Sequence, residues 1–106
     1  MAVKIVIADD HVMFREGLKQ ILKLDEKINV VAEASDGAEC IEVLQNARQE
    51  SEPDVLLLDI AMPGMNGFQV VDVLKKSGNV IPILILTASN EMDYLIHAID
   101  LGVDGY

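Results

Sequence analysis

The sequence predicts an α/β fold, a doubly wound parallel sheet with helices on both of its faces. Short runs of Val, Ile and Leu alternate along the chain with segments in which apolar residues recur at helical spacing. Strict alternation of strand and helix, joined by right-handed crossovers, produces parallel strands, and consecutive apolar residues indicate that both strand faces are covered. The 106 residues, 51% hydrophobic and 25% charged, suit one domain with one core.

The first strand is expected at residues 3–8, and the helix after it presents an apolar face of Phe14, Leu18, Ile21 and Leu22. The second strand is expected at residues 28–34. A turn at Ser35-Asp36-Gly37 then caps a helix with an inner face of Ala38, Ile41 and Leu44. This helix fades into the polar residues 46–52 and ends before Pro53.

The third strand is expected at residues 54–59, followed by a loop containing Pro63, Gly64, Asn66 and Gly67. The apolar members of the next helix are Phe68, Val70, Val71, Val73 and Leu74, and Ser77-Gly78-Asn79 stops it. The fourth strand is expected at residues 81–87. Asn90 caps a last helix whose core-facing residues are Leu95, Ala98 and Ile99, and Gly102 closes that helix.

Composition excludes several classes of protein. There is no apolar run near 18 residues, and the N-terminus enters the first strand without a signal-peptide pattern, so we expect no membrane segment and a cytoplasmic location. The net charge of −10 opposes direct DNA binding by this segment, because DNA phosphates are themselves negative. The single Cys40 cannot form an internal disulfide, and its position in a helical pattern predicts a small packed or half-exposed side chain.

Three carboxylates are placed at the ends of predicted strands. Asp9 and Asp10 follow the first strand, and Asp59 closes the third. In an open parallel sheet, ligands bind beyond the carboxyl ends of the strands, so the three side chains are expected to meet in one crevice. Unpaired, they would repel one another and raise their pKa values, and such a cluster usually holds a hard cation, with Mg²⁺ as the leading candidate.

Two other functions of this architecture fit less well. A flavodoxin-type nucleotide binder needs a Gly-rich or Ser/Thr-rich anion cradle after the first strand, where this chain has two negative charges. A haloacid-dehalogenase-type phosphatase also uses an aspartate at a strand end as its nucleophile. It expects a second aspartate two positions later, however, and Ala61 occupies that position after Asp59.

The motifs together resemble those of a response-regulator receiver domain. The resemblance rests on Asp9-Asp10, Asp59, Thr87-Ala88 and the loop Met62-Pro63-Gly64-Met65-Asn66-Gly67, and it covers essentially the whole chain. Asp9-Asp10-His11, Arg15-Glu16-Gly17-Leu18 and Gly102-Val103-Asp104-Gly105-Tyr106 look most like the NarL/FixJ-type subclass. The resemblance implies a flavodoxin-like strand order of 2-1-3-4-5 and a two-component switch that receives a phosphoryl group from a histidine kinase.

The resemblance also implies roles for individual residues. Asp59 would be the phosphoacceptor nucleophile, and Asp10, Asp59 and the backbone carbonyl of Ala61 would bind Mg²⁺, with Asp9 acting through a metal-bound water. His11 is expected to begin a helix and to cap it or line the rim of the crevice, rather than to bind metal.

Two further residues resemble the switch positions of the family. Thr87, at the end of the fourth strand, would sense the phosphate, and Tyr106 would be the aromatic switch residue. His97 is expected on the surface of the last helix.

The chain departs from the family pattern after Tyr106, where a lysine that pairs with the phosphate is expected. We read it as a C-terminally incomplete receiver domain, residues 1–106, with the fifth strand and last helix largely absent and DNA contacted only through an effector domain absent from this chain. The apolar edge of the fourth strand predicts self-association, for example as a homodimer. The alternative is a phosphorylation-independent interaction or dimerisation module.

Overall fold

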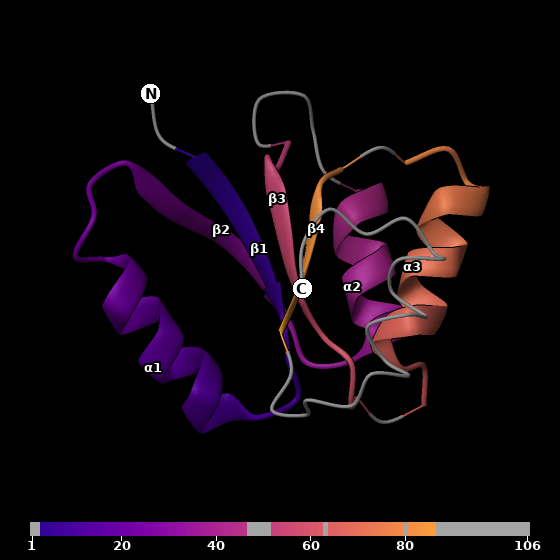
Figure 1. Cartoon of the computed structure of the whole chain (residues 1–106), viewed down its shortest axis with the longest axis horizontal. Helices are drawn as coiled ribbons and strands as arrows, with labels where there is room; N and C mark the ends of the chain where they lie inside the picture. The colour runs from indigo at the N-terminus through magenta and orange to yellow at the C-terminus, as the bar shows by residue number, and fades with distance from the viewer. Residues whose placement is uncertain (1–2, 47–51, 63, 80, 87–106) are drawn as a thin grey trace.

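The sheet contains four parallel strands in the order β2-β1-β3-β4, as a computed structural model shows (Figure 1). The structure describes residues 3–46, 52–62, 64–79 and 81–86. The strands are β1 (Val3–Ala8), β2 (Ile28–Ala34), β3 (Val55–Asp59) and β4 (Ile83–Leu86). The predicted parallel α/β sheet and the order of its first four strands are confirmed, and the first two strands have the predicted bounds.

Two helices cover one face of the sheet. These are α2 (Gly37–Gln45) and α3 (Gly67–Lys76), which lie on the same side in Figure 1. The larger hydrophobic cluster lies between them and the strands, and includes Val6, Ala8, Leu56, Leu58, Val70, Val71 and Leu74. Because all of these are almost completely shielded from solvent, this face contains most of the core. Cys40 is fully buried in it, so of the two predicted possibilities for this side chain, packed or half-exposed, the structure shows the packed one.

The remaining described helix, α1 (Val12–Leu22), lies on the opposite face of the sheet (Figure 1). It packs through Leu18 and Leu22 onto a small cluster of Ile5, Ile7 and Leu57. The prediction that Phe14 and Ile21 belong to the same buried face is wrong, because they are 50% and 66% exposed. Leu18 and Leu22, one turn apart, make the apolar contact, and Phe14 and Ile21 lie beside it largely in solvent.

The two caps show why α2 and α3 begin where they do. The Asp36 carboxylate accepts a hydrogen bond from the backbone N–H of Glu39, which confirms the predicted cap of α2. Asn66 forms a capping box with Gln69 at the start of α3. The sequence predicted a loop at Asn66 but not this cap. In α2 the buried residues are Gly37, Cys40 and Leu44, and the predicted inner residue Ala38 is exposed.

β4 begins at Ile83 rather than at the predicted residue 81, because Ile81 donates its N–H to the Asn79 side chain instead of to a neighbouring strand.

Other predictions concern residues outside the described ranges. The helix expected after Asn90, with His97 on it, lies outside the described residues, as do Pro63, Thr87 and Tyr106. Among the helices of the described ranges, none has the length and apolar character needed to cross a membrane.

Candidate functional site

Two adjacent strands deliver the predicted carboxylates to one edge of the sheet. β1 ends at Ala8, so Asp9 and Asp10 follow it directly, and Asp59 is the last residue of β3. β1 and β3 pair in parallel with Ala8 beside Leu58, which brings the two strand ends together. One ligand atom from each of Asp9, Asp10, Asp59 and His11 lies within 4.8 Å of all the others. We call these four residues the acidic cluster.

The members of the acidic cluster differ in their hydrogen bonds. Asp9 Oδ1 accepts the backbone N–H of His11 at 2.8 Å, and its distance to His11 Nδ1 is 3.1 Å. Asp59 Oδ1 accepts a long hydrogen bond of 3.4 Å from the Ala61 N–H. Asp10 Oδ1 is buried and accepts no hydrogen bond from the residues that the structure describes, although His11 Nδ1 lies 3.1 Å away. A buried carboxylate oxygen without a donor is a place that a cation would satisfy.

The charges of the cluster act on one another. Burial raises the pKa of Asp59, and the neighbouring Asp9 carboxylate raises it further, while the Ala61 N–H acts in the opposite direction. The hydrogen bond to Asp9 and the negative charge of Asp10 raise the pKa of His11. The negative charges of Asp9 and Asp10 contribute to both shifts, and a bound cation would offset that contribution.

Sequence reasoning assigned no role to Arg15, which lies on α1 and contacts the backbone of the acidic cluster. Its guanidinium donates to the carbonyl of Asp9, and its Nε lies 3.2 Å from Glu33 Oε1 on β2. Lys19 Nζ contacts the other oxygen of Glu33 at 2.9 Å, so α1 is tied to the edge strand by two cations. The sequence offered two signals for Arg15, which are its place in the motif Arg15-Glu16-Gly17-Leu18 and its position about one turn after the acidic pair, on the helix that follows.

Gly67 allows the start of α3 to pack against the end of β3. A Cβ atom at this position would lie 2.5 Å from the Asp59 carbonyl oxygen and 2.9 Å from the Ile60 Cα. The Gly67 N–H also donates to the Ile60 carbonyl at 2.9 Å. The backbone that carries Asp59 is therefore held by direct contact with a helix that has no side chain at this point.

Of the other predicted site residues, two lie at the cluster and two lie outside the described residues. Ala61 lies beside the cluster through its N–H bond to Asp59. His11 immediately precedes α1, but its side chain makes no capping hydrogen bond and turns to the carboxylates at the rim instead. Thr87 and Tyr106 lie outside the described residues.

The residues present fit a divalent cation. Three carboxylates supply the oxygen ligands that Mg²⁺ prefers, and the unpaired Asp10 oxygen is one of them. Asp9 is only 4% exposed and Asp59 only 9%, so the negative charge is held largely out of water. Asp59 is thus both a candidate ligand and a carboxylate near enough to the cation to react under its influence.

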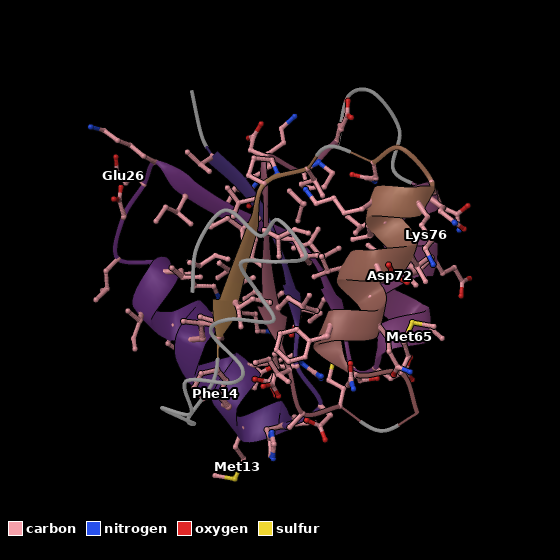
Figure 2. The ribbon with its side chains drawn as sticks, turned by 45° about the vertical axis from the view of Figure 1, so that its right-hand side comes forward. Met13, Phe14, Glu26, Met65, Asp72 and Lys76 are labelled. Carbon is pink, nitrogen blue, oxygen red and sulfur yellow. The ribbon has the colours of Figure 1, made fainter. Side chains whose placement is uncertain are left out.

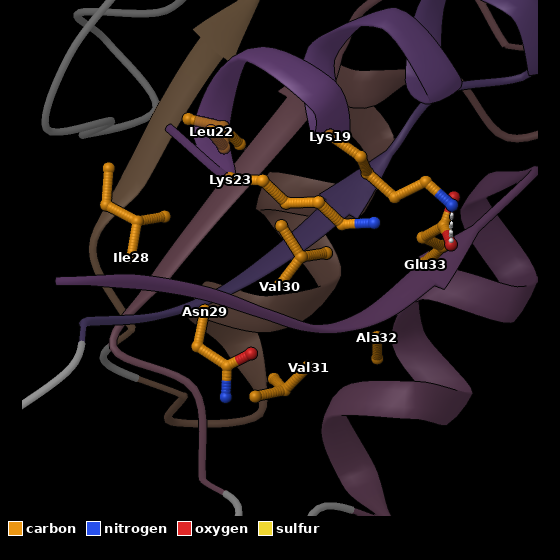
Figure 3. A pocket seen from close by; sticks show the side chains of 9 residues that line it. All are labelled: Lys19, Leu22, Lys23, Ile28, Asn29, Val30, Val31, Ala32 and Glu33. Carbon is orange, nitrogen blue, oxygen red and sulfur yellow. Dashed lines mark hydrogen bonds and ion pairs between the residues drawn. The ribbon is translucent and has the colours of Figure 1, made fainter. Parts of the chain in front are cut away.

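The described residues also form a shallow hollow of about 290 Å³ between α1 and β2 (Figure 3). It is lined by Lys19, Leu22, Lys23, Ile28, Asn29, Val30, Val31, Ala32 and Glu33. The ion pair between Lys19 and Glu33, drawn as a dashed line in Figure 3, lies at one end of it. Its lining contains no group of metal ligands, and its Lys19 amine is held by Glu33, so the acidic cluster is the better candidate for chemistry.

A comparison with protein families shows which family the chain belongs to. Residues 5–106 match the model of the response regulator receiver domain. The chain belongs to the response-regulator receiver domain family. The resemblance drawn from the sequence motifs is therefore confirmed.

Relatives place this receiver domain in the NarL type. It is 40% identical over 103 residues to the nitrate/nitrite response regulator protein NarP of Escherichia coli, and 38% identical over 102 residues to NarL of the same bacterium. These matches cover 97% and 96% of this chain. They cover only 46% and 45% of the two relatives, so the chain spans about half the length of the curated proteins it matches.

Solved structures agree with this assignment. The signal receiver domain of NarL from Mycobacterium tuberculosis is 38% identical, with a TM-score of 0.87 over 98% of this chain and 81% of that one. The isolated receiver domain of RcsB from Salmonella enterica serovar Typhimurium, solved with the phosphomimetic BeF₃⁻, is 28% identical. Its TM-score is 0.84, over 97% of this chain and 74% of that chain.

Proposed function

We propose that this receiver domain accepts a phosphoryl group on Asp59 from a histidine kinase, with Mg²⁺ in the acidic cluster. The observation that carries the proposal is the position of the Asp59 carboxylate, at the end of β3 and within 4.8 Å of ligand atoms from Asp9 and Asp10. A carboxylate placed beside a cation site is suited to attack a phosphoryl group, whose negative charge three bare carboxylates would repel.

In the proposed transfer, an oxygen of Asp59 attacks the phosphorus in line with the leaving group. The bond from oxygen to phosphorus forms as the phosphorus–nitrogen bond of the kinase phosphohistidine breaks, and the imidazole keeps the electron pair. Mg²⁺ held by Asp10, Asp59 and the Ala61 carbonyl, with Asp9 acting through water, would neutralise charge on the transferring group.

The chain's own residues hold the nucleophile in place. Contact with Gly67 fixes the backbone of Asp59, and the Ala61 N–H holds one carboxylate oxygen. Arg15 holds the carbonyl of Asp9 and so orients the acidic turn after β1. From the family resemblance, we propose that Thr87 then donates to the phosphate and that Tyr106 changes position with it.

The names of the relatives suggest the output. NarP and NarL are named as nitrate/nitrite response regulators, and a third relative, YdfI of Bacillus subtilis, as a transcriptional regulatory protein at 37% identity. We therefore propose that phosphorylation of residues 1–106 controls transcription, through dimerisation and through an effector domain that contacts DNA. The net charge of −10 supports the assignment of DNA contacts to a different domain.

The test is the intact mass of the protein after incubation with acetyl phosphate, with and without Mg²⁺. We expect a phosphoryl increment in the wild type only when Mg²⁺ is present, and none in Asp59→Asn. Asp72→Asn is the matched control, because this partly exposed carboxylate on α3 pairs with Lys76 at 3.1 Å, away from the cluster (Figure 2). It should be labelled as the wild type is.

Two results would overturn the proposal. One is labelling of Asp59→Asn to the wild-type extent, which would place the phosphoryl group elsewhere. The other is no labelling of the wild type by acetyl phosphate or by a kinase phosphodonor, which would favour the phosphorylation-independent interaction module.

A further inference from the structure

We propose that His11 is a nitrogen ligand of the cation in the acidic cluster, so that the site binds first-row transition ions such as Co²⁺ and Ni²⁺ through a residue that Mg²⁺ does not need. The inference rests on the proposed function in one respect, the presence of a cation in the cluster. It adds a fourth ligand and a metal preference to the three carboxylates.

The spacing of the side-chain atoms supports a shared ion. His11 Nδ1 lies 3.1 Å from Asp9 Oδ1 and 3.1 Å from Asp10 Oδ1. In an octahedral site with ligands at about 2.1 Å, neighbouring ligands are about 3.0 Å apart. Both nitrogen–oxygen distances are therefore those expected of neighbouring ligands around one small cation.

Hydrogen bonding alone leaves this arrangement incomplete. Nδ1 carries at most one proton, and the hydrogen bond that it makes goes to Asp9 Oδ1, which already accepts the backbone N–H of His11. Asp10 Oδ1, at the same distance, is buried without a hydrogen bond. A cation in place of the proton on His11 Nδ1 would contact the nitrogen and both carboxylate oxygens. It would also satisfy Asp10 Oδ1, which the proton leaves without a hydrogen bond.

The backbone holds His11 in position for this contact. Its N–H donates to Asp9 at 2.8 Å, and its carbonyl accepts the N–H of Arg15 at 3.0 Å in the first turn of α1. The imidazole is 67% exposed, so one side of the cluster is open to ions from solvent.

The identity of the fourth ligand predicts a metal preference. Oxygen ligands suit Mg²⁺, whereas imidazole suits Ni²⁺, Cu²⁺, Zn²⁺ and related ions. Transition ions would therefore compete with Mg²⁺ for this site, and their affinity for it would depend on His11.

The experiment compares the affinities of Co²⁺ and Mg²⁺ for the full chain by isothermal titration calorimetry. We expect His11→Gln to weaken Co²⁺ binding by about tenfold or more, while Mg²⁺ binding changes by less than about twofold. His97→Gln is the control for general histidine binding and should leave both affinities unchanged. The visible absorption of bound Co²⁺ gives a second readout, which His11→Gln should shift.

Unchanged Co²⁺ affinity and absorption in His11→Gln would overturn the inference, as would equal weakening of Co²⁺ and Mg²⁺. Asp10→Asn should weaken both ions, and Co²⁺ binding that survives this substitution would place the ion elsewhere and also overturn it. The proposed function is tested separately, by Mg²⁺ binding to the wild type and by the labelling of the wild type and Asp59→Asn with acetyl phosphate.

Discussion

The Asp59 carboxylate occupies a position that disfavours its own charge. Burial is the main cause of its raised pKa, and the Asp9 carboxylate adds to it. A group whose pKa is higher in the folded state contributes stability below its unfolded pKa and loses that contribution as the pH rises through the folded value. The metal-free protein is therefore less stable at neutral pH than it would be with a neutral side chain at this position.

Asp59→Asn should stabilise the metal-free protein at neutral pH, because it removes this charge without changing the shape of the side chain. We expect a rise in Tm, because the charge that burial disfavours is then absent from the folded protein. The difference should shrink as the pH falls through the folded pKa of Asp59, and vanish below its ordinary value of 3.8. Thermal melts in EDTA across this pH range provide the measurement.

Asp72→Asn is again the matched control, and should change the Tm little at any pH, because surface ion pairs contribute about 0–1 kcal/mol. An Asp59→Asn variant that melts below the wild type at neutral pH would show that this carboxylate is already balanced without metal.

At the scale of elements, two glycines with opposite surroundings show how the helices hold the site. Gly67 at the start of α3 touches the backbone of Asp59 and Ile60, so the helix and strand meet without an intervening side chain. Gly17 lies within α1, and a Cβ there would meet no atom of the described part of the chain within 4 Å. The first glycine is required by packing, whereas the second only weakens its helix.

Gly67→Ala should destabilise the protein by about 1–3 kcal/mol, because the added methyl group must displace backbone at the end of β3. Gly17→Ala should instead stabilise it by about 0.5–1 kcal/mol through helix propensity. Chemical denaturation of both variants gives the comparison. Equal stability of Gly67→Ala and the wild type would mean that the α3 and β3 contact is looser than described.

At the scale of the whole molecule, the reactivity of the Cys40 thiol shows whether the larger core is closed to solvent. Its side chain is fully buried in the cluster between α2, α3 and the sheet, and burial raises its pKa to about 12. The thiolate is the reactive form of cysteine, so the native protein should have almost no reactive thiol at neutral pH.

Labelling of Cys40 by a thiol reagent should therefore be slow and limited by opening of the core, and should become fast in denaturant. The rate at increasing denaturant concentrations measures the free energy of opening. Gly67→Ala should speed labelling and Gly17→Ala should slow it. Immediate reaction of the native wild type would contradict the buried position of this thiol.

The distribution of apolar groups over the molecule is uneven. One face of the sheet contains most of the core, whereas on α1 the side chains of Val12, Met13 and Phe14 are exposed by 58%, 89% and 50%. Met13 projects away from the body in Figure 2. The described residues thus close one side of the sheet tightly and leave an apolar strip at the start of α1 in solvent.

The sequence by itself determined the parallel sheet, the bounds of β1 and β2, and the meeting of Asp9, Asp10 and Asp59. These features are local in origin: consecutive apolar residues mark a strand covered on both faces, and parallel strands end at the same edge. The cap at Asp36 was predictable for the same reason, because its partner is three residues away.

Tertiary structure alone decided how each helix faces the sheet and what surrounds the cluster. Helical spacing grouped Phe14 and Ile21 with Leu18, but only packing against the strands shows which of them is covered. The hydrogen bond of Arg15 to the Asp9 carbonyl and the contact of Gly67 with the backbone of Asp59 join separate elements, and neither could be predicted from the local sequence. Periodicity records which residues are apolar, whereas the partner that each side chain meets depends on segments brought together only by folding.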